Sequence, residues 1–144
     1  MADDSEVRVR LLDHTADLGL EVEGPSLESV IAGAASGMTR LILGDASAPG
    51  HDLRVFEVAA AEPSLLLRNV LRELLFLYAA EDFALARCEV ELVGREPELV
   101  ARCRARGGVP EGLPDTELKG VTLHGLVAEL RDGGGWRARV IFDV

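Results

Sequence analysis

Hydrophobic and polar residues alternate in two short stretches near the start of the chain. Residues 7–12 alternate, and residues 18–23 place two leucines and a valine on one face and two glutamates on the other. A period of two is typical of β-strands that bury one face. The pattern therefore predicts two strands separated by the polar tetrad "HTAD", and it places that tetrad at a strand end.

The pattern then changes to helical spacing. Apolar residues recur every three or four positions over residues 26–42, with Ser26 at the N-cap and Gly44 just beyond the end. Pro63, followed by a serine, opens a second segment whose leucines cover a wider face. We expect two helices, of which the second is the more buried.

Two further alternating stretches flank the tetrapeptide "GREP", a plausible hairpin turn. They cover residues 86–94 and 98–106. If Gly94 pairs with Pro97, the register places Cys88 opposite Cys103. Two cysteines are too few for a disulfide framework or a thiolate zinc site, so two reduced thiols are the favoured interpretation and a cross-strand disulfide is the alternative.

Strand patterns also occur at residues 53–61, 121–132 and 136–144, with "GGG" as the turn between the last two. A polar linker rich in glycine and proline spans residues 107–120, and loops of this length are often functional. The order is two strands, a helix, a strand, a helix and four strands. It predicts an α+β two-layer sandwich, with two helices packed on one face of a mixed or antiparallel sheet. We expect residues 1–144 to form a single domain, with residues 1–6 disordered.

Composition excludes several classes of function. Of the 144 residues, 48% are hydrophobic, and 25 acidic residues outnumber 15 basic ones, which gives a net charge of −10. Such a charge repels phosphate backbones, so we expect no stable nucleic-acid binding of the protein's own. No apolar run is long enough to cross a membrane, and the acidic start lacks the layout of a signal peptide. We therefore expect a cytoplasmic protein.

Carboxylates occur at two strand ends. Asp17 closes "HTAD", and Asp143 is the penultimate residue, beside the α-carboxylate of Val144. If the last strand ends near the tetrad, these anions converge, and converging anions are costly unless a cation neutralises them. Oxygen-rich clusters suit Ca²⁺, Mg²⁺ or Mn²⁺. A polar turn and an acidic chain end remain the alternative interpretation.

Three stretches together resemble one known family. "HTADLGLEVEGPSLESVIAGAASGM" is similar to the N-terminal signature of the archeases, "TELKGVTLHGL" to the stretch around the family's functional lysine, and "RVIFDV" to its C-terminal motif. The resemblance spans nearly the whole chain in the same order. The chain departs from the family's pattern in two places. A histidine that often precedes the lysine motif is missing, and "TLH" replaces "TYH".

The resemblance implies a function and a set of residues. Archeases are protein cofactors, not enzymes, of the RtcB-type RNA ligase in tRNA splicing, and they promote its guanylylation and repeated turnover. The family's metal-binding residues fall on Asp17 and Asp143, with Val144 nearby, and its functional lysine falls on Lys119. The resemblance favours a bound divalent metal ion, foremost Ca²⁺, with Mn²⁺ or Mg²⁺ as alternatives. The chain has no P-loop, so we do not expect it to bind GTP itself.

Two other functions stay open from the residues alone. In a metal-dependent phosphoester hydrolase, His14 or His124 would be the general base and the two aspartates would hold the metal. A general chaperone or metal-buffering module is the third hypothesis. We expect a structural role for His14, a surface or core-edge position in a strand for His124, and a loop position for His51.

Overall fold

The computed structural model describes residues 6–13 and 17–144. His14 lies outside these ranges, and so do residues 1–5 of the segment 1–6 that was predicted to be disordered. Within the described ranges the chain forms two helices and eight strands, so the α+β class is confirmed. The order is the predicted one, except that the strand predicted over residues 121–132 is divided into two short strands, β6 and β7. The elements are β1 (Arg8–Asp13), β2 (Asp17–Gly24), α1 (Leu27–Leu43), β3 (Asp52–Ala60), α2 (Pro63–Glu81), β4 (Ala84–Gly94), β5 (Leu99–Gly108), β6 (Gly120–Val121), β7 (Val127–Leu130) and β8 (Trp136–Asp143).

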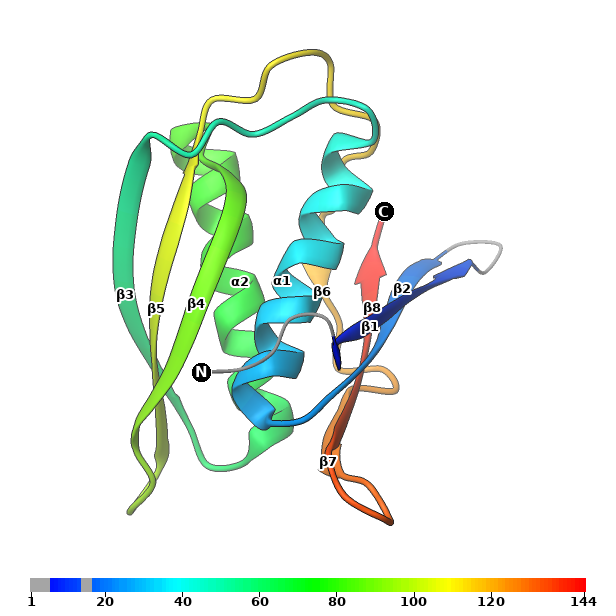
Figure 1. Cartoon of the computed structure of the whole chain (residues 1–144). Helices are drawn as coiled ribbons and strands as arrows, with labels where there is room; N and C mark the ends of the chain where they lie inside the picture. Colours follow the sequence, from blue (N-terminus) through cyan, green and yellow to red (C-terminus); the bar gives the residue numbers. More distant parts are fainter. Residues whose placement is uncertain (1–5, 14–16) are drawn as a thin grey trace.

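The strands form two antiparallel sheets rather than the single sheet that the sequence predicted. The first sheet has the order β1-β2-β8-β6, with β7 also paired to β8, and the second has the order β3-β5-β4. The two helices lie between them, as Figure 1 shows: α1 packs on β4 on one side and on β2 and β8 on the other. We call these sheets the β8 sheet and the β5 sheet.

The helices can lie between two sheets because both are apolar around much of their circumference. In α1, buried residues face both layers, and α2 buries five leucines and a valine. Gly33 and Gly37 lie one turn apart on α1, where the helix approaches the β8 sheet closely. A Cβ at Gly33 would lie 2.9 Å from Val22 Cγ1, and one at Gly37 would lie 2.9 Å from Leu20 Cδ1. Amphipathic spacing predicts one buried face for each helix, and helices with one buried face would cover a single sheet. For this reason the sequence predicted only two layers.

Local signals fixed the ends of the helices. The Ser26 hydroxyl accepts a hydrogen bond from the Ser29 N–H, so Ser26 is the N-cap of α1 as predicted. The Ser29 hydroxyl accepts a hydrogen bond from the Ser26 N–H in return, which completes a capping box that the sequence analysis did not predict. Gly44 ends it with a φ of +57°. Pro63 begins α2. Among the described residues, no helix is long and apolar enough to span a membrane.

The predicted register of the β4–β5 hairpin is wrong by two residues. Cys88 lies opposite Ala105, and Cys103 lies opposite Val90. The connection is wider than a four-residue turn, because Gly94 pairs with Val100 instead of Pro97. Both cysteines are free, as the favoured interpretation had it. A thiol–thiol hydrogen bond between them lowers the pKa of Cys88 and, together with burial, raises the pKa of Cys103.

The linker after β5 is anchored to the C-terminal end of α1. Ser47 and Glu111 form an isolated bridge, and the N–H groups of Asp115 and Thr116 both donate to the carbonyl oxygen of Ile42, at 2.8 and 3.1 Å. These main-chain bonds fix the path of a segment without regular structure. The linker thereby brings Lys119 to the end of the β8 sheet.

Candidate functional site

Two aspartates lie at one end of the β8 sheet. The antiparallel register of β2 and β8 places Asp17, the first residue of β2, directly opposite Asp143, the last residue of β8. Directly opposite residues share one face of a sheet, with their Cβ atoms roughly 4.5–5.5 Å apart. The structure therefore brings together the two carboxylates whose convergence the sequence left open.

Lys119 joins the same strand end through its main chain. Its N–H donates to the carbonyl oxygen of Asp143 at 2.8 Å, and the next residue, Gly120, pairs with Asp143 as the start of β6. The Lys119 side chain itself is exposed. A Cβ at Gly120 would lie 3.8 Å from Asp143 Oδ2, so this glycine leaves the Asp143 carboxylate uncovered. We call Asp17, Lys119 and Asp143 the acidic tip.

The acidic tip is accessible to ions and partners. Asp143 is exposed and Asp17 is half-buried, while Val144, the third predicted metal-site residue, is 44% exposed and follows Asp143 directly. Within residues 6–13 and 17–144, no third histidine, cysteine, aspartate or glutamate joins the pair to form a cluster of three. Main-chain carbonyls, water or a partner's groups would complete the coordination of any ion held there.

The donor atoms at the tip fit a hard divalent cation. Like charges directly opposite each other destabilise a sheet, and a cation between the two carboxylates removes that cost. Carboxylate and carbonyl oxygens are the ligands that Ca²⁺, Mg²⁺ and Mn²⁺ prefer. Asp17 and Asp143 are the side chains that would hold such an ion, and this role stays a prediction.

A glycine that the sequence analysis missed shapes the base of the tip. Gly19 lies opposite Ile141, one row along from the aspartates on the same face. A Cβ there would lie 2.7 Å from Ile141 Cδ1 and 2.9 Å from the carbonyl oxygen of Val140. The Ile141 side chain is only 4% exposed. The signal was present, since an isolated glycine inside an alternating strand indicates close approach of a neighbour.

Two of the histidines, His51 and His124, lie among the described residues, and both are exposed. The sequence predicted a strand position for His124, and this prediction is wrong. His124 lies between β6 and β7, in a turn where Gly125 has a φ of +64°. It is exposed, and its N–H donates to Thr122 Oγ1 at 3.2 Å. His51 is exposed just before β3, in the loop position that the sequence predicted.

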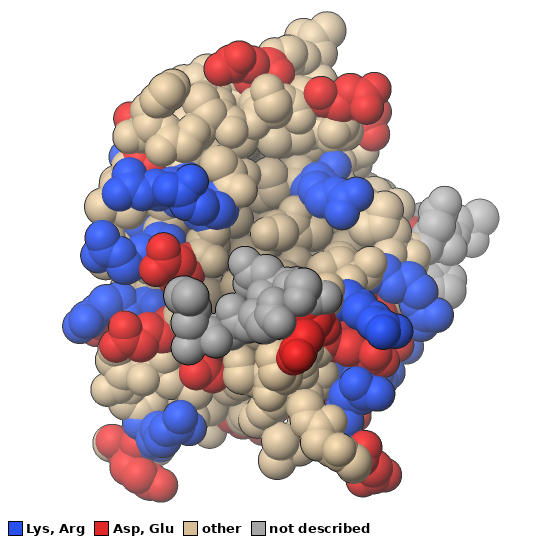
Figure 2. All heavy atoms as spheres, in the orientation of Figure 1, with Lys and Arg blue, Asp and Glu red and all other residues tan. Residues whose placement is uncertain are grey.

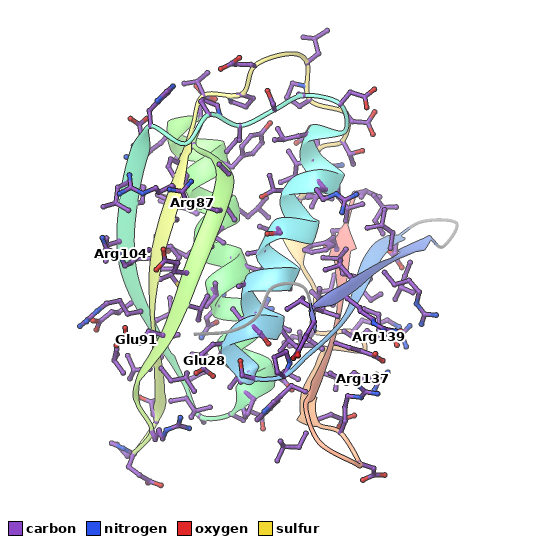
Figure 3. All side chains as sticks on the ribbon, viewed as in Figure 1. Glu28, Arg87, Glu91, Arg104, Arg137 and Arg139 are labelled. Atoms are coloured by element: carbon purple, nitrogen blue, oxygen red, sulfur yellow. The ribbon has the colours of Figure 1, made fainter. Side chains whose placement is uncertain are left out.

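Arginines and glutamates pair on the outer face of the β8 sheet, beyond the tip. Figure 3 labels two of the arginines of β8, Arg137 and Arg139. Arg10 Nη2 lies 2.9 Å from Glu21 Oε2, and Arg137 lies 3.6 Å from Glu21 and 3.2 Å from Glu129. The hydrogen bond from Arg10 lowers the pKa of Glu21, with Arg137 adding to the effect. The Nε atom of Arg139 is buried and has no hydrogen-bond partner among the described residues. Charges on this face largely neutralise one another.

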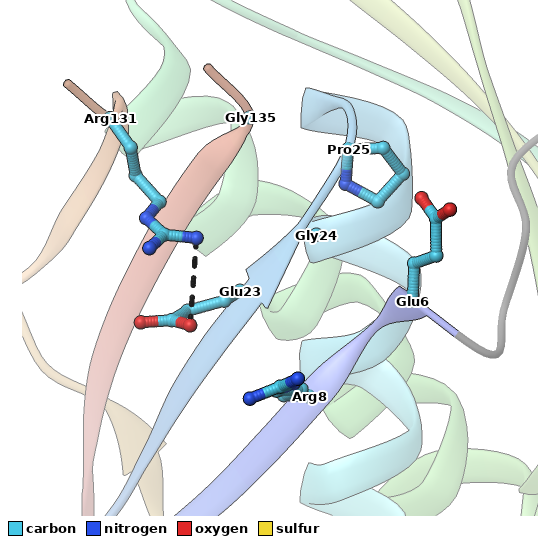
Figure 4. Close-up of a pocket in the computed structure, with 7 residues that line it drawn as sticks. All are labelled: Glu6, Arg8, Glu23, Gly24, Pro25, Arg131 and Gly135. Carbon is cyan, nitrogen blue, oxygen red and sulfur yellow. Dashed lines mark ion pairs between the residues drawn. The ribbon is translucent and has the colours of Figure 1, made fainter. Parts of the chain in front are cut away.

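A pocket of about 360 Å³ lies at the other end of β2 (Figure 4). Its charged residues are of both signs, and Arg131 Nη1 lies 3.6 Å from Glu23 Oε2 across it. The lining residues are Glu6, Arg8, Glu23, Gly24, Pro25, Arg131 and Gly135. The pocket is separated from the acidic tip by the length of β2, so the tip is an exposed strand end and not the wall of this cavity.

Comparisons with known proteins agree over nearly the whole chain. Residues 10–144 match the model of the archease protein family. The protein archease of Methanosarcina mazei is 34% identical over 139 residues, which cover 92% of this chain and 93% of that protein.

Two solved structures are similar as well. The solution structure of Methanobacterium thermoautotrophicum protein 1598 has a TM-score of 0.79 and 28% identity, covering 94% of this chain and 98% of that one. The crystal structure of a Thermotoga maritima archease, described as a possible chaperone, has a TM-score of 0.59 and 23% identity, covering 94% and 96%, and it supports the fold alone. The chain therefore belongs to the archease family.

Proposed function

We propose that this protein is an activator of an RtcB-type RNA ligase in tRNA splicing and RNA repair, and that it promotes ligase guanylylation and multiple turnover without being an enzyme itself. The observation that carries the proposal is the position of Asp143 directly opposite Asp17, with Lys119 bonded to it. These are the three residues to which the archease resemblance assigns function. They come from three distant parts of the chain and meet at one exposed strand end.

The chemistry of the acidic tip suits a task that involves phosphates. A divalent ion on Asp17 and Asp143 would supply concentrated positive charge, which stabilises negative charge on a phosphate. Asp17 and Asp143 would hold the ion and fix its place relative to the sheet. Lys119 adds an ammonium group beside them, which can reach a phosphate oxygen or a carboxylate of the partner. The tip could thus favour the ligase conformation that is competent for guanylylation.

The shape of the site supports an accessory role. Enzyme active sites are typically concave and lined by apolar side chains with a few polar groups. The tip is instead an exposed strand end with a half-buried Asp17 and an exposed Asp143. A group of this kind acts most simply by entering or bordering the active site of another protein, where water is excluded and each charge acts more strongly.

A ligation assay tests the proposal. The cognate ligase is incubated with GTP, Mn²⁺ and RNA bearing a 2′,3′-cyclic phosphate and a 5′-hydroxyl, and both guanylylation and repeated ligation are measured. We expect stimulation by the wild-type protein and its loss with Asp17→Asn or Asp143→Asn. Asp132→Asn, an exposed carboxylate in the β7–β8 turn, is the matched control and should stimulate normally.

Other outcomes would contradict the proposal. Hydrolysis of phosphoesters by the purified protein without any ligase would indicate an enzyme. Protection of unrelated proteins from aggregation, with no effect on the ligase, would indicate a general chaperone or metal-buffering module. Undiminished stimulation by both tip variants would show that the aspartates are not the functional residues.

A further inference from the structure

A second pair of like charges lies opposite each other on the β5 sheet. Arg87 on β4 is directly opposite Arg106 on β5. Arg104 lies two residues further along β5, and therefore on the same face. We call Arg87, Arg104 and Arg106 the arginine cluster. It lies on the sheet that contributes nothing to the acidic tip.

A β-bulge creates this pairing. The register of β4 and β5 shifts between Leu85 and Arg87, so Ala86 is an extra residue in β4. In a regular strand, Leu85 and Arg87 would point to the same face. Because of the bulge, Leu85 is buried and Arg87 is exposed. Bulges often redirect a side chain near functional sites, and this one adds Arg87 to a face on which β5 already carries Arg102, Arg104 and Arg106.

The cluster differs in its ion pairs from Arg54 and Arg102, the other two arginines in the strands of the β5 sheet. Arg102, on the same face of β5, lies 2.7 Å from Glu57, and Arg54 lies 3.0 Å from Glu81. Among the described residues, no ion pair involves any of the three clustered arginines. Glu89 lies opposite Arg104 in the register, yet the two do not form an ion pair. The cluster therefore keeps a net positive charge, even though the chain as a whole is strongly acidic.

Apolar side chains extend the same face toward the sheet edge. Leu53 lies opposite Arg106 and Val55 lies opposite Arg104, and they are 37% and 49% exposed. Figure 2 shows blue basic atoms on this side of the molecule, on the left of the view, with red acidic atoms between them, and Figure 3 labels Arg87 and Arg104 there. Arginine next to exposed apolar side chains is typical of protein–protein interfaces.

We propose that the outer face of the β5 sheet binds an acidic segment of a protein partner, with carboxylates on the arginine cluster and an apolar side chain on Leu53 and Val55. A carboxylate between Arg87 and Arg106 removes the repulsion of two opposed guanidinium groups, each of which can bind it in a bidentate manner. RNA fits less well. The chain's net charge of −10 repels a long polyanion, and the exposed strand residues of this face include no aromatic side chain for base stacking.

The test uses fluorescence anisotropy with a labelled peptide of alternating glutamate and leucine, and with a labelled oligouridylate of the same net charge. We expect the full-length protein to bind the peptide more tightly than the oligouridylate. Arg104→Gln and Arg106→Gln should each weaken peptide binding about tenfold, since each removes a charge-assisted hydrogen bond. Arg102→Gln is the matched control, because its guanidinium already pairs with Glu57, and it should change the affinity less than about twofold.

Further measurements separate this proposal from its alternatives. The Asp17→Asn variant should bind the peptide as tightly as the wild type does. The peptide-binding proposal therefore stands or falls separately from the function proposed for the acidic tip. Arg106→Gln should not lower the melting temperature, because it removes an opposed like charge. Tighter binding of the oligouridylate, an equal loss in Arg102→Gln and Arg106→Gln, or concentration-dependent self-association that Arg106→Gln abolishes would each overturn the proposal of an acidic protein segment.

Discussion

Asp17 and Asp143 lie directly opposite each other on neighbouring antiparallel strands, although one is near the start of the chain and the other near its end. Two carboxylates in this relationship repel each other, and a protein gains stability when a cation or a protonated group intervenes. The predictions below begin with this pair and extend to the strands and side chains around it.

Binding of a divalent ion should stabilise the protein through the two aspartates. At 100 times its Kd, Ca²⁺ should add about 2.7 kcal/mol and raise the melting temperature by roughly 5 to 10 °C. In the presence of a metal chelator, the melting temperature of the Asp143→Asn variant should be no lower than that of the wild type, because the substitution removes the charge that repels Asp17. Thermal melts with chelator, Ca²⁺ and Mn²⁺ measure this, and a full metal-induced shift in both Asp17→Asn and Asp143→Asn would contradict it.

Lys119 should matter for the partner and not for the metal. It is the only lysine in the sequence, its side chain is exposed, and only its main chain bonds to Asp143. Lys119→Ala should lower stimulation of the ligase about tenfold, the size of one lost charge-assisted contact. Calorimetry should show metal affinity unchanged. Lys119→Arg keeps the charge and should retain part of the stimulation, and loss of metal binding in Lys119→Ala would mean that the lysine shapes the metal site itself.

Substitution by alanine should destabilise the protein at Gly19 and be tolerated at Gly120, although both glycines lie beside the tip. Gly19→Ala would place Cβ 2.9 Å from the carbonyl oxygen of Val140, so β2 and β8 must separate. We expect a loss of about 1–3 kcal/mol in the free energy of unfolding, together with weaker metal binding. Gly120→Ala meets only Asp143 Oδ2, at 3.8 Å, and should be tolerated. Urea melts compare the two variants, and equal stabilities would refute the close-approach argument.

The two cysteines should react at different rates. Cys88 is half-buried and its pKa is lowered by the hydrogen bond from Cys103, whereas Cys103 is fully buried and its pKa is raised. Since the thiolate is the reactive species, iodoacetamide should label Cys88 first in the native protein. Peptide mass spectrometry over a time course measures this. Cys88→Ser should leave the native protein nearly unlabelled, and faster labelling of Cys103 would show the assignment to be wrong.

Acid should destabilise the protein in part through Glu21. Its pKa is lowered in the folded state, chiefly by the hydrogen bond from Arg10. The carboxylate therefore stabilises the fold at pH values above its ordinary pKa of 4.5, and that contribution disappears as the pH falls through the folded value. Thermal melts over a range of acidic pH should show a shallower decline for Glu21→Gln. Glu98→Gln, in the exposed β4–β5 connection, controls for the lost charge and should decline as the wild type does.

Some of the candidate site could be identified from the sequence, because chemistry-bearing residues stand out in a strand pattern. Asp17 and Asp143 were predicted from their places at strand ends, whereas Lys119 lies in the linker and was assigned only by the resemblance to the archeases. The glycines at 19 and 120 were missed, since a residue without a side chain shows its importance only when its neighbours are known. Arg87 and Arg106 were missed for a different reason: their opposition depends on a bulge at Ala86, and no local pattern marks its position.

The sequence by itself determined both helices and most of the strands in their order, although the strand predicted over residues 121–132 is two short strands, β6 and β7. Helix ends depend on local hydrogen bonds and backbone angles, so Ser26, Gly44 and Pro63 marked them correctly. The tertiary structure alone decided which strands pair, in which register, and in how many sheets. Strand pairing joins residues far apart in the chain, and its register depends on turn width and bulges, as the two-residue error at Cys88 shows. For the same reason, the sequence could place an aspartate at each of two strand ends, but only the antiparallel pairing of β2 with β8 puts the two aspartates opposite each other.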